Sequence, residues 1–133
     1  MSQENVEVVR QGYEAWNRGD LEWLLERTAP DYEFHTAQLF PDTEAVYRGR
    51  EGLKRFWNTF RAPWKTVRIE ARRIEPIDEH RVLALFVFRG RARDGMEVTQ
   101  EYANLITVED GLATRAVGYA DWQEGLEAAG LSE

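Results

Sequence analysis

Apolar residues in the first half of the chain recur every three or four positions, a spacing that is typical of amphipathic helices. Gly19 is placed to end a first helix in the left-handed conformation, and Asp20 to cap a second helix that carries three leucines. Pro30 is expected to end that second helix, with a short strand after it. The pattern predicts helices over residues 4–17, from 21 onward, over 51–60 and over 122–129, and this first strand over 32–36.

The second half of the chain favours strands, with hydrophobic and polar residues alternating along much of it. Asp94-Gly95 predicts a two-residue hairpin, and Glu109-Asp110-Gly111 a second turn. A loop through Pro41 and Asp42 is expected to lead to Gly49. Four strands are predicted over residues 67–74, 81–93, 96–108 and 112–119.

The resulting order, α-α-β-α-β-β-β-β-α, predicts an α+β fold. We expect a curved antiparallel sheet with three helices on its concave side and a short C-terminal helix. Such a sheet forms a cone whose mouth the helices fill only in part. The length of 133 residues and the absence of a visible linker or repeat predict a single domain over residues 1–133.

The strand over residues 96–108 carries the most informative pattern. Its mostly apolar face contains three consecutive hydrogen-bonding residues, Gln100, Tyr102 and Asn104. A buried amide without a partner costs about 1–3 kcal/mol, so this row needs internal partners or a ligand. We therefore expect these residues to line a cavity, where Asn104 could orient a ligand carbonyl or bond to another core residue.

Composition narrows the chemistry. The chain has no cysteine, which excludes disulfides, thiolate nucleophiles and zinc–thiolate sites. Its serines lie only at positions 2 and 132, so a serine nucleophile is not expected. Its net charge of −7 argues against nucleic-acid binding. We expect no metal and no cofactor, because neither histidine has a second ligand at metal-binding spacing. No apolar run is long enough to span a membrane, and the first residues lack the features of a secretory signal. A cytoplasmic location is the expectation.

Four segments, in the expected order and over nearly the whole chain, resemble the SnoaL-like branch of the nuclear transport factor 2-like superfamily: AWNRGDLEWLLERTAPDYEF (15–34), YRGREGLKRFW (47–57), VEDGLATRAVGYAD (108–121) and EGLEAAGL (124–131). The resemblance implies a cone-shaped α+β barrel and a homodimer formed through the outer sheet face. Members of that superfamily include ketosteroid isomerases, polyketide cyclases, dehydratases, epoxide hydrolases and proteins that only bind or scaffold.

The resemblance also locates the three catalytic positions of the isomerases. Their oxyanion tyrosine falls on Gly12, their general-base aspartate on Thr36, and their second oxyanion donor on Asn104. Two of the three groups are absent, and the third is an amide that donates a hydrogen bond but cannot move a proton. The chemistry of a standard ketosteroid isomerase is therefore disfavoured.

His35 is the one plausible proton shuttle at neutral pH. Strict alternation, however, puts it on the same face as Glu33 and puts Thr36 on the inner face. Asp20 and Asp121 could act as bases, but both have the spacing of helix caps. Five aromatic residues could form an apolar wall for a ligand or simply belong to the core: Trp16, Trp57, Phe60, Phe86 and Phe88.

Three arginines, Arg89, Arg91 and Arg93, lie along one face of the long strand over residues 81–93. They could contact an anionic ligand or protect a solvated strand edge, but cross-strand pairing with Glu97, Thr99 or Glu101 is the expected use.

Three functional hypotheses remain. The first is a SnoaL-like protein that binds a hydrophobic, carbonyl-bearing small molecule in an enclosed pocket. The second is a cofactor-independent cyclase, isomerase or dehydratase that acts beside a carbonyl, with Asn104 or Tyr102 polarising it and His35 or a carboxylate moving the proton. The third is a dimeric scaffold with a vestigial pocket.

Overall fold

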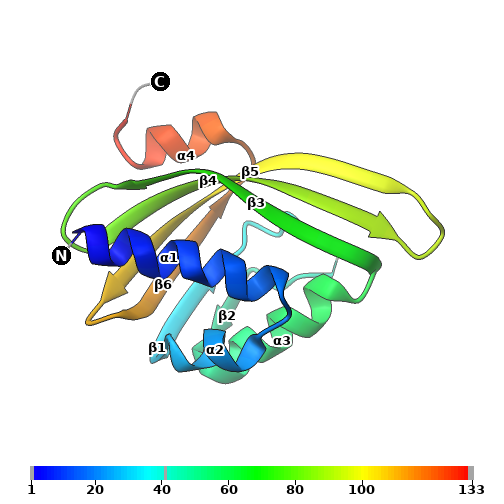
Figure 1. The fold of residues 1–133 in the computed structure, drawn as a ribbon, viewed down its shortest axis with the longest axis horizontal. Helices are drawn as coiled ribbons and strands as arrows, with labels where there is room; N and C mark the ends of the chain where they lie inside the picture. Colours follow the sequence, from blue (N-terminus) through cyan, green and yellow to red (C-terminus); the bar gives the residue numbers. More distant parts are fainter. Residues whose placement is uncertain (1, 41, 132–133) are drawn as a thin grey trace.

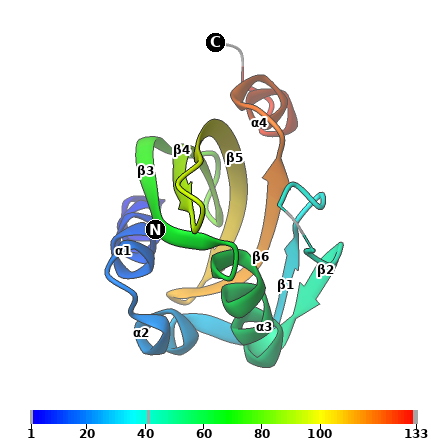
Figure 2. The same ribbon diagram turned by 90° about the vertical axis from the view of Figure 1, so that its right-hand side faces the viewer.

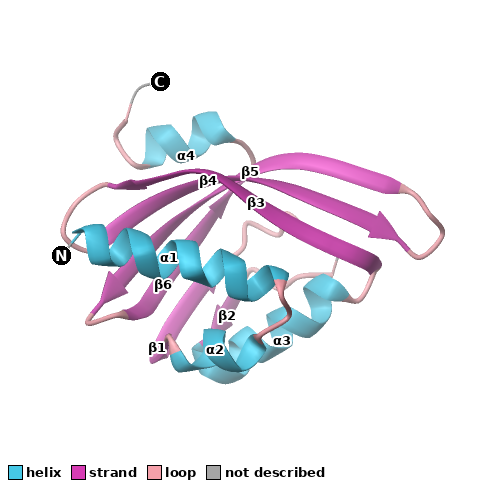
Figure 3. Ribbon diagram, viewed as in Figure 1, coloured by secondary structure: helices cyan, strands magenta, loops and turns pink. Residues whose placement is uncertain are grey.

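A computed structural model describes residues 2–40 and 42–131, which form four helices and six strands (Figure 3). In chain order these are α1 (Ser2–Asn17), α2 (Leu21–Glu26), β1 (Thr28–His35), β2 (Val46–Arg48), α3 (Gly49–Arg61), β3 (Trp64–Pro76), β4 (Arg81–Ala92), β5 (Glu97–Glu109), β6 (Leu112–Tyr119) and α4 (Trp122–Ala128).

All six strands belong to one sheet, in the order β2-β1-β6-β5-β4-β3. Neighbouring strands are antiparallel except β1 and β6, which run parallel. The sheet is strongly curved, with α1, α2 and α3 on its concave side and α4 on the opposite side (Figures 1 and 2). The predicted α+β class is confirmed, and the predicted antiparallel sheet is correct for every pair but β1 and β6.

Two predictions about the segment before α3 are wrong. The second helix ends at Glu26, and Pro30 lies inside β1, where the pairing of β1 with β6 shifts register between Thr28 and Glu33. Proline lacks an N–H group, so it is tolerated where the ladder of hydrogen bonds is irregular. The predicted loop before Gly49 contains the short strand β2, which pairs with the end of β1. Pro41 lies outside the described residues.

The two predicted hairpins differ in length. Asp110 and Gly111 both have positive φ angles, of 52° and 79°, and form the two-residue turn between β5 and β6. The connection between β4 and β5 spans residues 93–96, so the predicted two-residue turn is wrong. There the Asp94 side chain accepts a hydrogen bond from the Met96 N–H at 3.0 Å, which favours a wider turn.

Strand β4 is buried on both faces. Seven consecutive residues, from Val82 to Phe88, are buried, because the concave face packs toward the helices and the convex face packs against α4. On the convex side Leu83, Leu85 and Ala103 form a cluster with Leu126 and Ala129 of the C-terminal segment. The chain therefore has two apolar layers, one on each side of the sheet.

The convex layer depends on a close approach between α4 and β5. A Cβ atom added at Gly125 would lie 2.5 Å from the Cβ of Ala103, a distance at which one backbone must move. Only glycine therefore lets α4 lie this close to the sheet.

We predict that Gly125→Val destabilises the protein by about 1–3 kcal/mol, the range measured for overpacked cores, because α4 is pushed away from Ala103. Urea unfolding followed by circular dichroism measures the loss. The matched control is Gly12→Val in α1, where an added Cβ meets nothing within 4 Å. Equal stability of the Gly125→Val protein and the wild type would contradict the close packing of α4.

Candidate functional site

A cavity with a volume of about 170 Å³ lies between the concave face of the sheet and the covering helices. Most of its wall is aliphatic or aromatic, and residues from α1, α2, α3 and all strands except β2 contribute to it. An apolar cavity of roughly 150 Å³ in another protein holds one benzene molecule, so this cavity is large enough for a small ring.

The polar row predicted on β5 reaches the cavity only in part. Tyr102 and Asn104 line it, together with Ile106 and Val108 of the same face. Gln100 does not: it is exposed, opposite Phe88 on β4. Periodicity correctly predicts the face, but the hairpin of β4 and β5 extends past the covering helices, so residues near its tip face solvent (Figure 1).

Asn104 forms a hydrogen bond to a tyrosine on the opposite wall. Its Nδ2 donates to the Tyr13 hydroxyl oxygen at 3.0 Å, which links β5 to α1 across the cavity. Burial raises the pKa of Tyr13 well above its usual value, and the hydrogen bond from Asn104 offsets this only in part. Tyr13 therefore stays protonated at neutral pH and is not a base there, while its hydroxyl oxygen accepts the hydrogen bond from Asn104.

Tyr32 on β1 is a second buried phenol in the cavity wall. Burial raises its pKa, and the nearby Tyr13 hydroxyl raises it further. Neither tyrosine was a predicted site residue, because helical spacing places Tyr13 with the apolar face of α1. The sequence signal that could have identified them is that both are apolar-face residues whose side chains end in a hydroxyl group.

The three positions that the isomerase resemblance singles out, Gly12, Thr36 and Asn104, all line this cavity. The hydroxyl of Thr36 is already engaged: it donates to the Glu44 carbonyl oxygen at 2.6 Å and accepts from the Gln38 N–H at 3.0 Å. Thr36 therefore shapes the wall and fixes the loop after β1.

His35 does not line the cavity. It shares the outer face of β1 with Glu33, as alternation predicts, and its Nε2 lies 3.0 Å from Glu33 Oε1. The hydrogen bond from His35, followed by that from Arg48, lowers the pKa of Glu33, and Arg115 adds a third contact at 3.4 Å. The structure thus keeps this predicted proton shuttle away from the cavity.

The expected aromatic wall is largely present. Trp16, Phe60 and Phe86 line the cavity, but Trp57 does not. The Trp57 ring packs against Trp16, with 4.7 Å between the ring centres, and the Arg61 guanidinium lies 4.4 Å from the centre of the Trp57 ring. The Trp16 indole N–H is buried and has no hydrogen-bond partner among the described residues. Further rings in the wall come from Trp23, Phe34, Phe40 and Phe56.

The remaining polar candidates have structural roles. Asp20 caps α2 through the Trp23 N–H at 3.0 Å, and this bond lowers its pKa; Asp121 caps α4 through the Glu124 N–H at 2.8 Å. Both capping predictions are confirmed.

The three arginines of β4 and its turn lie outside the cavity lining. Arg91 pairs across the strands with Glu97, as predicted, but Arg89 pairs with Glu70 of β3. The Arg93 Nε donates to the Ala62 carbonyl oxygen at 3.3 Å.

The cavity wall carries very little charge. Among the described residues that line it there is no aspartate, glutamate, histidine or lysine, and Arg27 is the one charged side chain. The described residues also contain no cluster of three or more potential metal ligands. Within the same ranges, no helix has the length and apolarity needed to cross a membrane.

The sequence profile of the SnoaL-like domain matches residues 9–116. The chain belongs to the SnoaL-like family. No curated protein matches it.

Solved structures share its fold across nearly the whole chain. A nuclear transport factor 2-like protein of unknown function from Burkholderia pseudomallei superposes with a TM-score of 0.81 at 22% identity, covering 96% of this chain and 97% of that one. TerC, co-crystallised with polyporic acid, superposes with a TM-score of 0.78 at 21% identity, covering 96% of this chain and 98% of that one. A Mycobacterium tuberculosis protein in complex with estradiol-17β-hemisuccinate superposes with a TM-score of 0.75 at 17% identity, covering 90% of this chain and 95% of that one.

We predict that alkali destabilises this SnoaL-like protein above a pH of about 10, where tyrosine ionises in an unfolded chain. Tyr13 and Tyr32 resist ionisation when folded, so the unfolded state gains stability first and the free energy of unfolding falls as pH rises. The ultraviolet absorbance of tyrosinate should show a late phase that the Tyr13→Phe/Tyr32→Phe protein lacks. A single phase near pH 10 in the folded wild type would contradict the burial of both hydroxyls.

Proposed function

We propose that this SnoaL-like protein binds a hydrophobic small molecule that carries a carbonyl oxygen. The observation that carries the proposal is the Tyr13–Asn104 hydrogen bond inside an otherwise apolar cavity. Two structural neighbours that share the fold were crystallised with small molecules, which supports a ligand-binding role for the same cone.

The direction of this hydrogen bond determines which ligand atom is favoured. Because the Asn104 amide donates to the Tyr13 oxygen, the hydrogen of the Tyr13 hydroxyl is left to donate elsewhere. A hydroxyl that accepts one hydrogen bond becomes a better donor for a second. A ligand carbonyl oxygen is the complementary acceptor, and the aromatic wall fits the apolar body next to it. In this proposal Asn104 positions Tyr13, and Tyr13 contacts the ligand.

The enzyme hypothesis is less well supported than binding. A proton transfer beside a carbonyl needs a base within hydrogen-bond reach of the substrate. The lining residues of the described chain include no carboxylate and no imidazole, and burial keeps Tyr13 protonated. His35, the predicted base, is bonded to Glu33 on the other face of β1. We therefore propose binding as the activity of this cavity.

We predict that Tyr13→Phe and Asn104→Leu each weaken ligand binding about tenfold, because a hydrogen bond in an apolar site contributes about 1–1.5 kcal/mol. A thermal-shift screen of steroids, aromatic polyketides, cyclic ketones and fatty acids identifies the ligand class, and calorimetry measures the affinities. His35→Ala is the control and should bind as the wild type does. Unchanged affinity in both Tyr13→Phe and Asn104→Leu would contradict the proposed anchor, and no stabilisation by any class would contradict the function.

The homodimer implied by the family resemblance stays a prediction. The outer face of β3, β4 and β5 away from α4 carries paired charges such as Arg89–Glu70 and Arg91–Glu97. Native mass spectrometry at micromolar protein should show a dimer, and a monomer alone would contradict this prediction.

A further inference from the structure

Arg27 is the one charged residue among the described residues that line the cavity. It directly follows α2, and its side chain is exposed, whereas the other lining residues are buried or half-buried. Among the described residues that line the cavity, Arg27 is therefore the one most open to solvent. Its backbone is held on both sides: its N–H donates to the Trp23 carbonyl oxygen at 3.2 Å, and its own carbonyl oxygen accepts from the Ala113 N–H of β6 at 2.8 Å.

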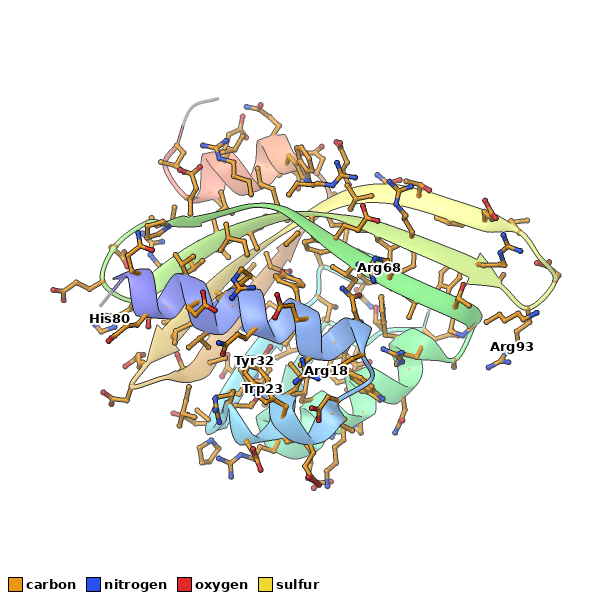
Figure 4. All side chains as sticks on the ribbon, viewed as in Figure 1. Arg18, Trp23, Tyr32, Arg68, His80 and Arg93 are labelled. Atoms are coloured by element: carbon orange, nitrogen blue, oxygen red, sulfur yellow. The ribbon has the colours of Figure 1, made fainter. Side chains whose placement is uncertain are left out.

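The guanidinium of Arg27 has no carboxylate partner among the described residues. It lies 5.1 Å from the centre of the Trp23 ring, which is itself part of the cavity wall. Arg18, labelled near Trp23 in Figure 4, instead forms an ion pair with Asp20 at 3.0 Å. Three other arginines, Arg50, Arg61 and Arg93, also form no ion pair within the described ranges, but each donates a side-chain hydrogen bond to a backbone carbonyl oxygen. Among the described residues, the Arg27 guanidinium has neither kind of partner.

We propose that the ligand of this cavity carries a carboxylate that binds Arg27 at the mouth, while its carbonyl-bearing apolar body extends inward to Tyr13. This inference rests on the proposed function and specifies its ligand class: a hydrophobic keto acid. The planar guanidinium can form two parallel hydrogen bonds to a carboxylate, and the Trp23 ring restricts its orientation beforehand.

Cavity size and charge agree with this arrangement. A volume of about 170 Å³ accommodates one small ring, so a longer ligand must extend to the mouth, where Arg27 is located. No carboxylate lines the described wall, so an entering anion meets no like charge there. Charges on distant surfaces are screened beyond about 8–10 Å at physiological salt, so the net charge of −7 does not oppose binding at this point.

The experiment compares an acid with its neutral analogue. Benzoylbutyrate carries a phenyl ketone and a carboxylate, and its methyl ester keeps the ketone and removes the negative charge. Calorimetric titration of both probes into wild type, Arg27→Gln and Arg18→Gln gives six affinities. Arg18→Gln is the matched control, because it removes the same charge from an arginine that does not line the cavity.

We expect the wild type to bind the acid about two- to fivefold more tightly than the ester, a factor appropriate for a contact with an exposed arginine. Arg27→Gln should remove this preference and leave the ester affinity unchanged, and Arg18→Gln should keep it. Equal binding of acid and ester by the wild type would overturn the keto-acid inference and leave the proposed function intact. An equal loss of preference in both arginine variants would also overturn it, because the effect would then be one of overall charge.

If neither probe binds the wild type while a neutral ketone from the screen does, the keto-acid inference is overturned and the proposed function stands. Binding of the ester that Tyr13→Phe weakens, without any contribution from Arg27, would support the function alone. The two proposals therefore fail in distinguishable ways.

Discussion

The two-sided burial of β4 is the constraint on which the rest of the structure depends. A strand with seven consecutive buried residues must be covered on both faces. The convex side is closed by α4, which Gly125 lets lie against Ala103. The concave side is covered by α1, α2 and α3, and side chains there do not fill all the space. The cavity is thus the space that side chains leave unfilled on the concave face, whereas α4 closes the convex face.

The polar groups that line this cavity are mostly paired within the protein. Most hydroxyls and amides on the wall are bonded to other protein groups, as in Thr36 and in Asn104 with Tyr13. Charge is confined to Arg27 at the rim of the described wall. In the proposed binding mode, ligands are distinguished by the positions of two oxygen functions, one at Tyr13 and one at Arg27, and by the apolar volume between them. The described lining residues include no carboxylate and no imidazole.

Much of the fold could be predicted from the sequence, because the helical and strand periods, the caps and the glycine turns are local signals. The inner face of β5 was predictable for the same reason, and so was the outward direction of His35. The position of Gln100 was not, since periodicity assigns a face but does not say where the covering helices end. Strand β2 is three residues long, too short for any pattern. Tyr13 lies in α1 and Arg27 directly follows α2, and only the packing of these two helices on the sheet brings them to one cavity.

The unpaired indole N–H of Trp16 has a consequence for the lifetime of the protein in a cell. A buried indole N–H costs about 1–3 kcal/mol of stability when no protein group, water or ligand accepts its hydrogen bond, and no described protein group does so for Trp16. A bound molecule with an acceptor near this group would remove the cost, in addition to the stabilisation that any ligand provides by mass action. Because a change of 1–2 kcal/mol alters cellular abundance several-fold, a ligand bound as proposed would raise the steady-state amount of this protein.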